Sequence, residues 1–191
     1  MTTKLPEPKI GRPRRYDLRP VPNFANTDVA LAVAALDELL ERTLDQFDDL
    51  PQAALDFAPQ GTPLTIGALV IHMAWAEMGW VERIAPASIP DDLRARLEPG
   101  RKVPKGEGVT STETARDLVT LCRRVRDEVS YPALATITDA DVIIHSWQRP
   151  LTPRGVLMHL IWHWTYHSAH IGLLRELWGS DYTWTFGSLG A

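Results

Sequence analysis

Apolar residues recur at helical spacing in four long segments of the chain, and loops rich in proline, glycine and charge separate these segments. A recurrence every three to four residues is typical of an amphipathic helix with one buried face. Asn26 or Thr27 caps the first segment, and Gly179 ends the last one, which begins after Pro153. The expected helices span about residues 28–48, 62–84, 110–129 and 154–178.

The two middle helices carry their own start and stop signals. Thr62 as N-cap and Pro63 in the first turn predict the beginning of the second helix. The pattern Thr110-x-x-Glu113 predicts a capping box at the start of the third helix. We expect Tyr131-Pro132 to end that helix, because the residue before a proline disfavours the helical conformation.

A long connection, residues 86–109, joins the second expected helix to the third. It is rich in proline, glycine and charge, and we expect a short helix near residues 91–97. Such a length is typical of a crossover or of a lid over a site. A second irregular region, residues 135–151, contains Val142-Ile143-Ile144 and is expected to hold a short extended piece. Four long helices with one long crossover between the second and the third predict an all-α four-helix bundle.

Composition bounds the number of domains. The chain has 191 residues, which is enough for one sizeable core. Residues 1–22 contain five prolines and six basic side chains, so this segment has too little apolar surface to fold alone. We therefore expect an extended Pro/Arg-rich segment over residues 1–25, packed on its own or a partner subunit, and a bundle domain over residues 26–191.

Charge and cysteine content limit the classes of binding partner and the kinds of cross-link that the chain can have. With 24 acidic and 20 basic side chains the net charge is −4, so no whole-chain basic field attracts nucleic acid or a membrane. The tetrapeptide Gly11-Arg12-Pro13-Arg14 resembles the core of an AT-hook and keeps a DNA-associated protein as a remote alternative. No apolar run suits a membrane span or a signal peptide, which predicts a cytoplasmic protein. The single cysteine, Cys122, excludes a disulfide framework and is expected to be buried.

Four of the six histidines lie close together in the last expected helix, at positions 159, 163, 167 and 170. At about 100° per residue they fall within an arc of roughly 80° that also carries leucines, so they face the interior. A buried imidazole without a partner costs about 1–3 kcal/mol. One such histidine is usually a hydrogen-bonded core residue, but four together indicate a divalent metal, for which neutral imidazole is the commonest nitrogen ligand.

Helical spacing suggests which histidines could act together. A pair four residues apart can bind one ion, so His159 with His163 and His163 with His167 are candidate pairs. His72 is the best third ligand because it lies mid-helix among apolar neighbours, whereas His145 lies in an irregular region and is expected to be exposed. A site of His72, His163 and His167 leaves coordination open for water or substrate, which is typical of a catalytic metal.

Two segments of the sequence resemble the DinB/YfiT-like family of metal-dependent four-helix bundles. The first, residues 64–77, places His72 in the second helix with an acidic residue five positions later. The second, residues 162–171, contains an HxxxH motif formed by His163 and His167. The resemblance covers roughly residues 27–178 and implies that these three histidines hold zinc or nickel. It also implies a thiol substrate, because members with a known activity are often transferases or isomerases that use bacillithiol or mycothiol.

The chemistry of such a site suggests a reaction. Histidine-only ligation leaves the full positive charge of the ion, which favours an anionic thiolate. We therefore expect a thiol-dependent S-transferase that attacks a small electrophile. The alternatives are a metal-dependent hydrolase and a non-catalytic metal-binding stress-response bundle. His170 and Glu77 are the candidate catalytic residues, His170 as general base and Glu77 as proton acceptor, although a glutamate on a bundle helix is more often solvated or ion-paired.

Aromatic residues mark two further regions. Four tryptophans flank the histidines and are candidates for the wall of an apolar pocket, although core packing is their commoner role. They are Trp75, Trp80, Trp162 and Trp164. A second group near the end of the chain suggests a docking surface for another copy, so we expect a homodimer. This group comprises Trp178, Tyr182, Trp184 and Phe186.

Overall fold

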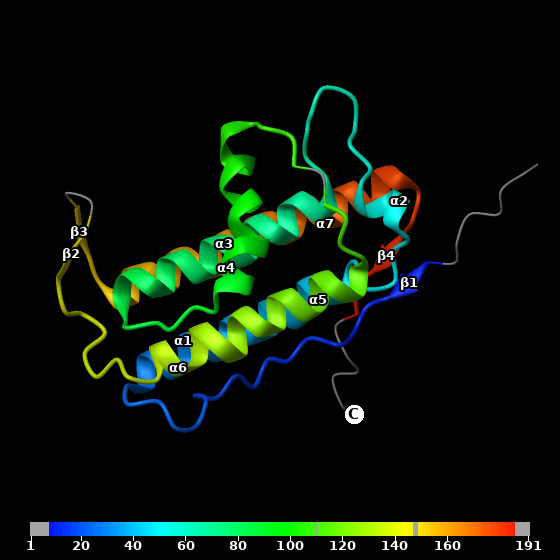
Figure 1. The fold of residues 1–191 in the computed structure, drawn as a ribbon. Coiled ribbons are helices and arrows are strands. Elements are labelled where there is room, and N and C mark those ends of the chain that lie inside the picture. The colour runs from blue at the N-terminus through cyan, green and yellow to red at the C-terminus, as the bar shows by residue number, and fades with distance from the viewer. Residues whose placement is uncertain (1–7, 110, 147–148, 186–191) are drawn as a thin grey trace, which may run out of the picture.

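The computed structural model of the chain describes residues 8–109, 111–146 and 149–185. It is mostly helical, as the periodicity predicts. In Figure 1 the long helices run beside one another, with α3 and α7 lying over α1 and α5. Helix α7 packs against α1 and α3, and α3 also packs against α5. The long helical segments are α1 (Thr27–Asp45), α3 (Ile66–Ile84), the run of α5 (Ala115–Arg124), η2 (Val125–Ser130) and α6 (Tyr131–Leu134), and α7 (Pro153–Trp178).

The first long helix begins, and the last begins and ends, where their caps predict, whereas the first ends at Asp45, three residues before the predicted position 48. The side chain of Asn26 accepts hydrogen bonds from the backbone N–H groups of Asp28 and Val29 at the start of α1. Thr152 caps α7 in the same way, and Gly179 ends it with a φ of 91°. Only glycine adopts this left-handed conformation at low cost, so the sequence signal here is direct.

Both middle helices begin later than predicted. The prediction of Thr62 as the cap of α3 is wrong: its hydroxyl accepts from the backbone N–H of Leu64 in a turn, and Thr65 caps the helix. Helix α5 begins at Ala115, where Thr114 and Asp117 form the capping box. Thr110 lies outside the described residues, and Glu113, its expected partner, binds Arg96 instead. In both cases the observed cap is a threonine a few residues after the predicted one.

The third long helix does not end at Tyr131-Pro132, contrary to the prediction. After α5 the chain passes through one wide π-helical turn, η2, and then continues as α6 to Leu134. Pro132 occupies the first turn of α6, where a proline's missing N–H is not needed. The wide turn also places Arg126 and Ser130 in the core, where both are buried.

The crossover between α3 and α5 contains the predicted short helix, α4 (Asp91–Leu97), followed by the 3₁₀ helix η1 (Glu98–Lys105). Helix η1 packs along α3. The contact is closest at Gly100, where an added Cβ would lie 2.8 Å from the backbone oxygen of Ile71. The crossover therefore forms a tight wall over the middle of α3.

The beginning and the end of the described chain are fastened to each other. Strand β1 (Lys9–Ile10) pairs in parallel with β4 (Tyr182–Thr183), with Lys9 opposite Tyr182 and Ile10 opposite Thr183. Tyr182 lies so close to Gly11 that a Cβ there would clash with its phenol ring. The expected packing of the N-terminal segment on its own subunit is thus observed from β1 onward.

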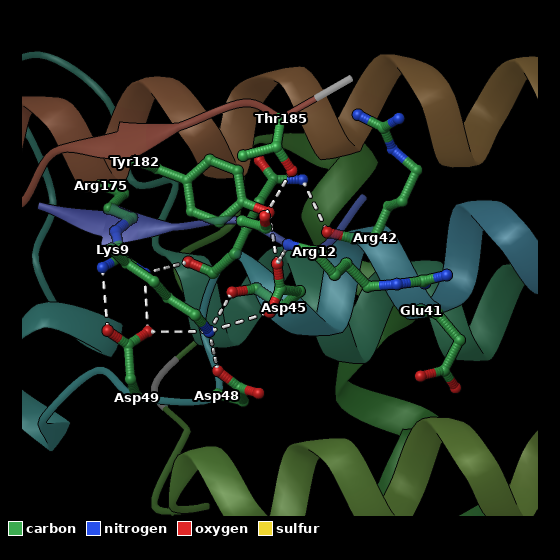
Figure 2. Close-up of polar contacts among 12 residues, drawn as sticks. Lys9, Arg12, Glu41, Arg42, Asp45, Asp48, Asp49, Arg175, Tyr182 and Thr185 are labelled. Carbon is green, nitrogen blue, oxygen red and sulfur yellow. Dashed lines mark hydrogen bonds and ion pairs between the residues drawn. The ribbon is translucent and has the colours of Figure 1, made fainter. Parts of the chain in front are cut away.

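A cluster of polar side chains reinforces this pairing, and we call it the terminal clamp (Figure 2). Lys9 contacts the acidic end of α1 and the following turn, Tyr182 donates to Asp45, and Arg175 binds Asp49 at 2.7 and 2.9 Å. The clamp comprises Lys9, Asp45, Asp48, Asp49, Arg175 and Tyr182.

The remaining elements are short. Helix α2 (Gln52–Leu55) precedes α3, and strands β2 (Ile144–Ser146) and β3 (Arg149–Leu151) form a hairpin next to the predicted extended piece. Within the described ranges no helix has both the length and the apolar character required to cross a membrane.

Candidate metal centre

Helices α3 and α7 bring five histidines to one side of their contact. His159, His163, His167 and His170 lie on successive turns of α7, as their spacing predicts, and His72 faces them from the middle of α3. The neighbours of His72 on α3 are mostly apolar and buried, and His72 and His163 are buried with them. His159, His167 and His170 are only partly buried, because exposed positions such as Trp162 and Tyr166 lie beside them on α7.

Three of the histidines converge. Nitrogen atoms of His72, His163 and His167 all lie within 4.8 Å of one another. The Nε2 atoms of His72 and His163 are 3.1 Å apart, and the rings of His163 and His167 have centroids separated by 4.5 Å. Among the described residues these three form the cluster whose donor atoms are close enough to share one ion.

The orientation of His72 is set by the crossover. Its Nδ1 lies 3.0 Å from the carbonyl oxygen of Gly100, which can only accept, so Nδ1 carries the proton. Nε2 therefore keeps its lone pair and points toward His163. Gly100 is a site residue that sequence reasoning missed, because a carbonyl in a distant loop leaves no side-chain signal.

The converging imidazoles are held in the neutral form. Burial lowers the pKa of His163 to about 3, and the neighbouring His167, His72 and His159 add to this shift. Burial, followed by His72 and His170, lowers the pKa of His167 to about 4. For His72 burial also lowers the pKa, and the Gly100 carbonyl opposes it. Neutral imidazole is the form that binds a metal ion.

These residues fit a divalent ion. The Nε2 atoms of His72 and His163 face each other at 3.1 Å, a separation that suits two nitrogen ligands of one tetrahedral ion. Three neutral nitrogen donors, one of them oriented by a backbone carbonyl, are a donor set typical of zinc and similar ions. The group of His72, His163 and His167 could therefore hold a metal ion.

The histidines line a cavity of about 440 Å³ between α3, η1 and α7. Its other walls are apolar or aromatic, and none of the described residues that line it is an aspartate, glutamate, lysine or arginine. Trp75 and Trp80 line it, as expected, whereas Trp164 is buried elsewhere in the core and Trp162 is exposed. The non-histidine walls comprise Leu64, Trp75, Ala76, Trp80, Val103, Pro104 and Tyr166.

Of the two candidate catalytic residues, only His170 lines the cavity. His170 lines the cavity beside His167, with ring centroids 5.6 Å apart, and its buried Nδ1 has no partner among the described residues. Glu77 does not line the cavity. Its carboxylate binds Arg126 through two hydrogen bonds of 2.9 and 3.0 Å and accepts from Ser130 at 2.6 Å. Burial opposes its charge, yet Arg126 holds the pKa of Glu77 below the usual value.

The remaining polar candidates are placed as expected or lie elsewhere. His159 also lines the cavity and packs on Trp80, with centroids 4.9 Å apart. His145 lies on β2 and is exposed. Cys122 is buried in α5, and burial raises the pKa of its thiol to about 12, which makes it a poor nucleophile.

The expected docking surface near the chain end is partly covered by the chain itself. Tyr182 packs on Gly11, Trp184 lies against the Arg42 guanidinium, and Trp178 packs on Phe57. The fourth member of this group, Phe186, lies outside the described residues.

Comparison with known proteins places this arrangement in a family. The sequence model of a family described as mycothiol-S-transferase matches residues 31–179. This stretch includes His72, His163 and His167, and the match confirms the resemblance drawn from their motifs. A solved structure, a DinB-like protein from Bacillus cereus, is 17% identical, with 78% of this chain and 91% of that chain covered and a TM-score of 0.43. None of the curated proteins matches this chain.

Proposed function

The chain belongs to the mycothiol-S-transferase family, and on this premise we propose that it transfers a low-molecular-weight thiol to a small electrophile. The residues that carry the proposal are His72, His163 and His167, whose neutral nitrogens converge within 4.8 Å. In this role they hold a divalent ion, zinc or nickel. When bound, such an ion stabilises the thiolate form of a thiol at neutral pH.

The absence of charge around the histidines supports a particular class of thiol. Glutathione and bacillithiol carry carboxylates, which usually pair with lysine or arginine in a binding site. None of the described residues lining the cavity has such a side chain. Mycothiol has no carboxylate, so its neutral sugar groups suit this cavity better. The tryptophans on α3 favour an apolar electrophile beside it.

We assign the proton-accepting role to His170. It lines the cavity next to His167, and its buried Nδ1 has no partner among the described residues, so it is placed to receive the proton of an entering thiol. Glu77 is assigned a structural role instead. Its ion pair with Arg126 joins α3 to η2 in the core and stabilises the fold.

The long helical segments support assigning residues 26–191 to a DinB/YfiT-like four-helix bundle domain, with residues 1–25 as an extended segment.

We further propose that two copies of the chain associate. Five large apolar side chains on the face of α7 beside the histidine stripe are each about half exposed, at one to two turns from one another, and one of them, Tyr166, also lines the histidine cavity. Leu173→Glu should convert a dimer into a monomer in sedimentation. These side chains are Met158, Trp162, Tyr166, Leu173 and Leu177.

Metal analysis of purified protein tests the site. We expect about one zinc or nickel ion per chain in the wild type and its loss in His163→Ala. His145→Ala is the matched control, because it removes an exposed histidine on β2 and should leave metal content unchanged. A wild-type protein that takes up neither ion would contradict the proposal.

Thiol transfer is tested with mycothiol, bacillithiol and glutathione and a fluorogenic bimane halide as electrophile. We expect conjugation with mycothiol in the wild type and in His145→Ala, and none in His163→Ala. Consumption of the electrophile without any thiol would favour the metal-dependent hydrolase. Metal binding with no turnover of any electrophile would favour the non-catalytic bundle.

A further inference from the structure

A second cavity lies on the opposite side of α7 from the histidines. Its volume is about 480 Å³, within the range of small-molecule sites. Its floor is formed by α1 and α7, through Ala35, Leu39 and Ile161 among others. Its rim is formed by the N-terminal segment around Arg14 and by Trp184. We call this cavity the arginine groove.

The groove has a positive electrostatic character. Arg14, Arg15 and Arg42 line it, and Glu38 is the one acidic side chain among its described lining residues. Glu38 is already neutralised, since its carboxylate binds Arg12 at 3.0 Å and Arg15 at 3.1 Å. A chain with a net charge of −4 thus presents a cationic cavity here.

Arg42 is the most informative of these residues. It is only 8% exposed, yet within the described part of the chain its guanidinium is held by the ring of Trp184, 4.4 Å from the centroid, and not by a carboxylate. Figure 2 shows its side chain turning away from the acidic residues of the terminal clamp. A buried cation is ordinarily paired, so an anion entering the groove would satisfy it.

The groove exists because both ends of the described chain are fastened. The pairing of β1 with β4 places the N-terminal segment over α1 and carries the chain on to Trp184. The lining residues from α7 are Ile161, Thr165, Ser168 and Ala169, which lie on the side of the helix away from the histidine stripe. The groove and the metal centre are therefore independent sites that share one helix.

We propose that the arginine groove binds a small amphipathic anion, in which an aromatic or acyl body carries a carboxylate or sulfonate group. The apolar floor receives the body, and the anionic group lies at the rim against Arg42 and Arg14. The proposal does not depend on the metal centre or on thiol transfer.

Two dyes that differ by one charged group test the proposal. Anilinonaphthalene sulfonate (ANS) carries the anion, and N-phenyl-1-naphthylamine is the same body without it. We expect saturable binding of ANS to the full chain, and displacement by decanoate or by 1-naphthoate will show whether an acyl or an aromatic body is preferred. Arg42→Gln should weaken ANS binding about tenfold and leave the neutral dye unchanged. Metal content and thiol transfer should not change.

Two more variants keep the test decisive. Ala35→Phe fills the groove from α1 without changing charge, and it should weaken binding of both dyes even if Arg42→Gln fails to fold. Trp80→Ala alters the histidine cavity and should leave ANS affinity unchanged. Unchanged ANS affinity in folded Arg42→Gln or Ala35→Phe, equal weakening of both dyes by Arg42→Gln, or loss of ANS binding in Trp80→Ala would each overturn the proposal.

Discussion

Two cavities of similar size lie on opposite sides of α7, and they differ in charge. The histidine cavity has no charged side chain among its described lining residues, whereas the arginine groove has three arginines and a glutamate. Helix α7 lines both cavities and carries no aspartate, glutamate, lysine or arginine from position 155 to position 174, so the difference comes from the elements that face it. Charge reaches the groove only from α1 and from the N-terminal segment.

The molecule satisfies its buried polar groups in two different ways. In the histidine cavity, neutral imidazoles converge, and one of them is oriented by a backbone carbonyl. Elsewhere in the molecule, buried charges are matched one against another, as in the Glu77–Arg126 pair and the terminal clamp. If the distinction is correct, variants of the charged pairs should change stability and leave the metal centre intact.

The largest effect is expected for Arg126→Met. Arg126 is 3% exposed and binds both Glu77 and Asp37, so its loss leaves a buried carboxylate without its partner. We expect the free energy of unfolding in urea to fall by about 3–5 kcal/mol, measured with chelator present. Metal content at low temperature should not change. Arg123→Met removes an exposed arginine paired with Glu41 and should cost less than about 1 kcal/mol. Equal losses in the two variants would contradict this view.

A smaller effect, confined to the metal centre, is expected for Gly100→Ala. The added methyl would meet the α3 backbone at 2.8 Å and displace the carbonyl that holds His72. We expect zinc affinity, measured against a chelator, to fall about 10- to 100-fold. The NMR signature of the His72 tautomer should change as well.

Gly108→Ala is the control for that prediction, since it lies in the same crossover and an added Cβ makes only an ordinary contact with Pro63 at 3.8 Å. Zinc affinity should be retained there. An unchanged His72 tautomer in Gly100→Ala would show that the carbonyl does not set it.

The smallest effect is expected in the terminal clamp, as a dependence on pH. Burial opposes the charge of Asp49, but Arg175, followed by Lys9, holds its pKa below the usual value. Because the folded pKa lies below the unfolded value of about 3.9, the clamp stabilises the fold above that pH and loses this contribution as the pH falls through the folded pKa. Asp49→Asn should therefore lower stability at pH 7 by about 1 kcal/mol or less and flatten its acid dependence.

Thermal unfolding between pH 2 and 7 measures this effect, with Asp17→Asn as a control that removes one exposed negative charge. Metal content at pH 7 should stay unchanged in both variants. Identical acid profiles for Asp49→Asn and the wild type would show that the terminal clamp does not contribute to the pH dependence of stability.

Sequence periodicity predicted much of the helical architecture because helix ends and apolar stripes are local properties. Asn26 and Gly179 act within a few residues of themselves, and both positions are as predicted. The histidine stripe on α7 and the inward position of His72 were predictable for the same reason. Helix starts were predicted at Thr62 and Thr110, but Thr65 and Thr114 cap these helices in the structure.

The features that sequence reasoning missed all depend on contacts between distant segments. The Gly100 carbonyl meets His72 across 28 positions, and Lys9 pairs with Tyr182 near the other end of the chain. Neither contact is indicated by a periodicity or a motif in the sequence. Glu77 was predicted as a proton acceptor, with an ion-paired residue as the alternative, and the structure shows the ion pair. Its partner Arg126 reaches the core through the wide turn η2, which no helix rule predicts.

The pairing of β1 with β4 also sets an order of events during synthesis. Lys9 leaves the ribosome early, but β4, which contains its partner Tyr182, is made after every other described helix and strand. At about 5–20 residues per second the N-terminal segment waits roughly 10–35 s before its strand partner exists. Strand β4 follows α7 by only a few residues, so the arginine groove cannot close before the helix that carries the histidines has also been made.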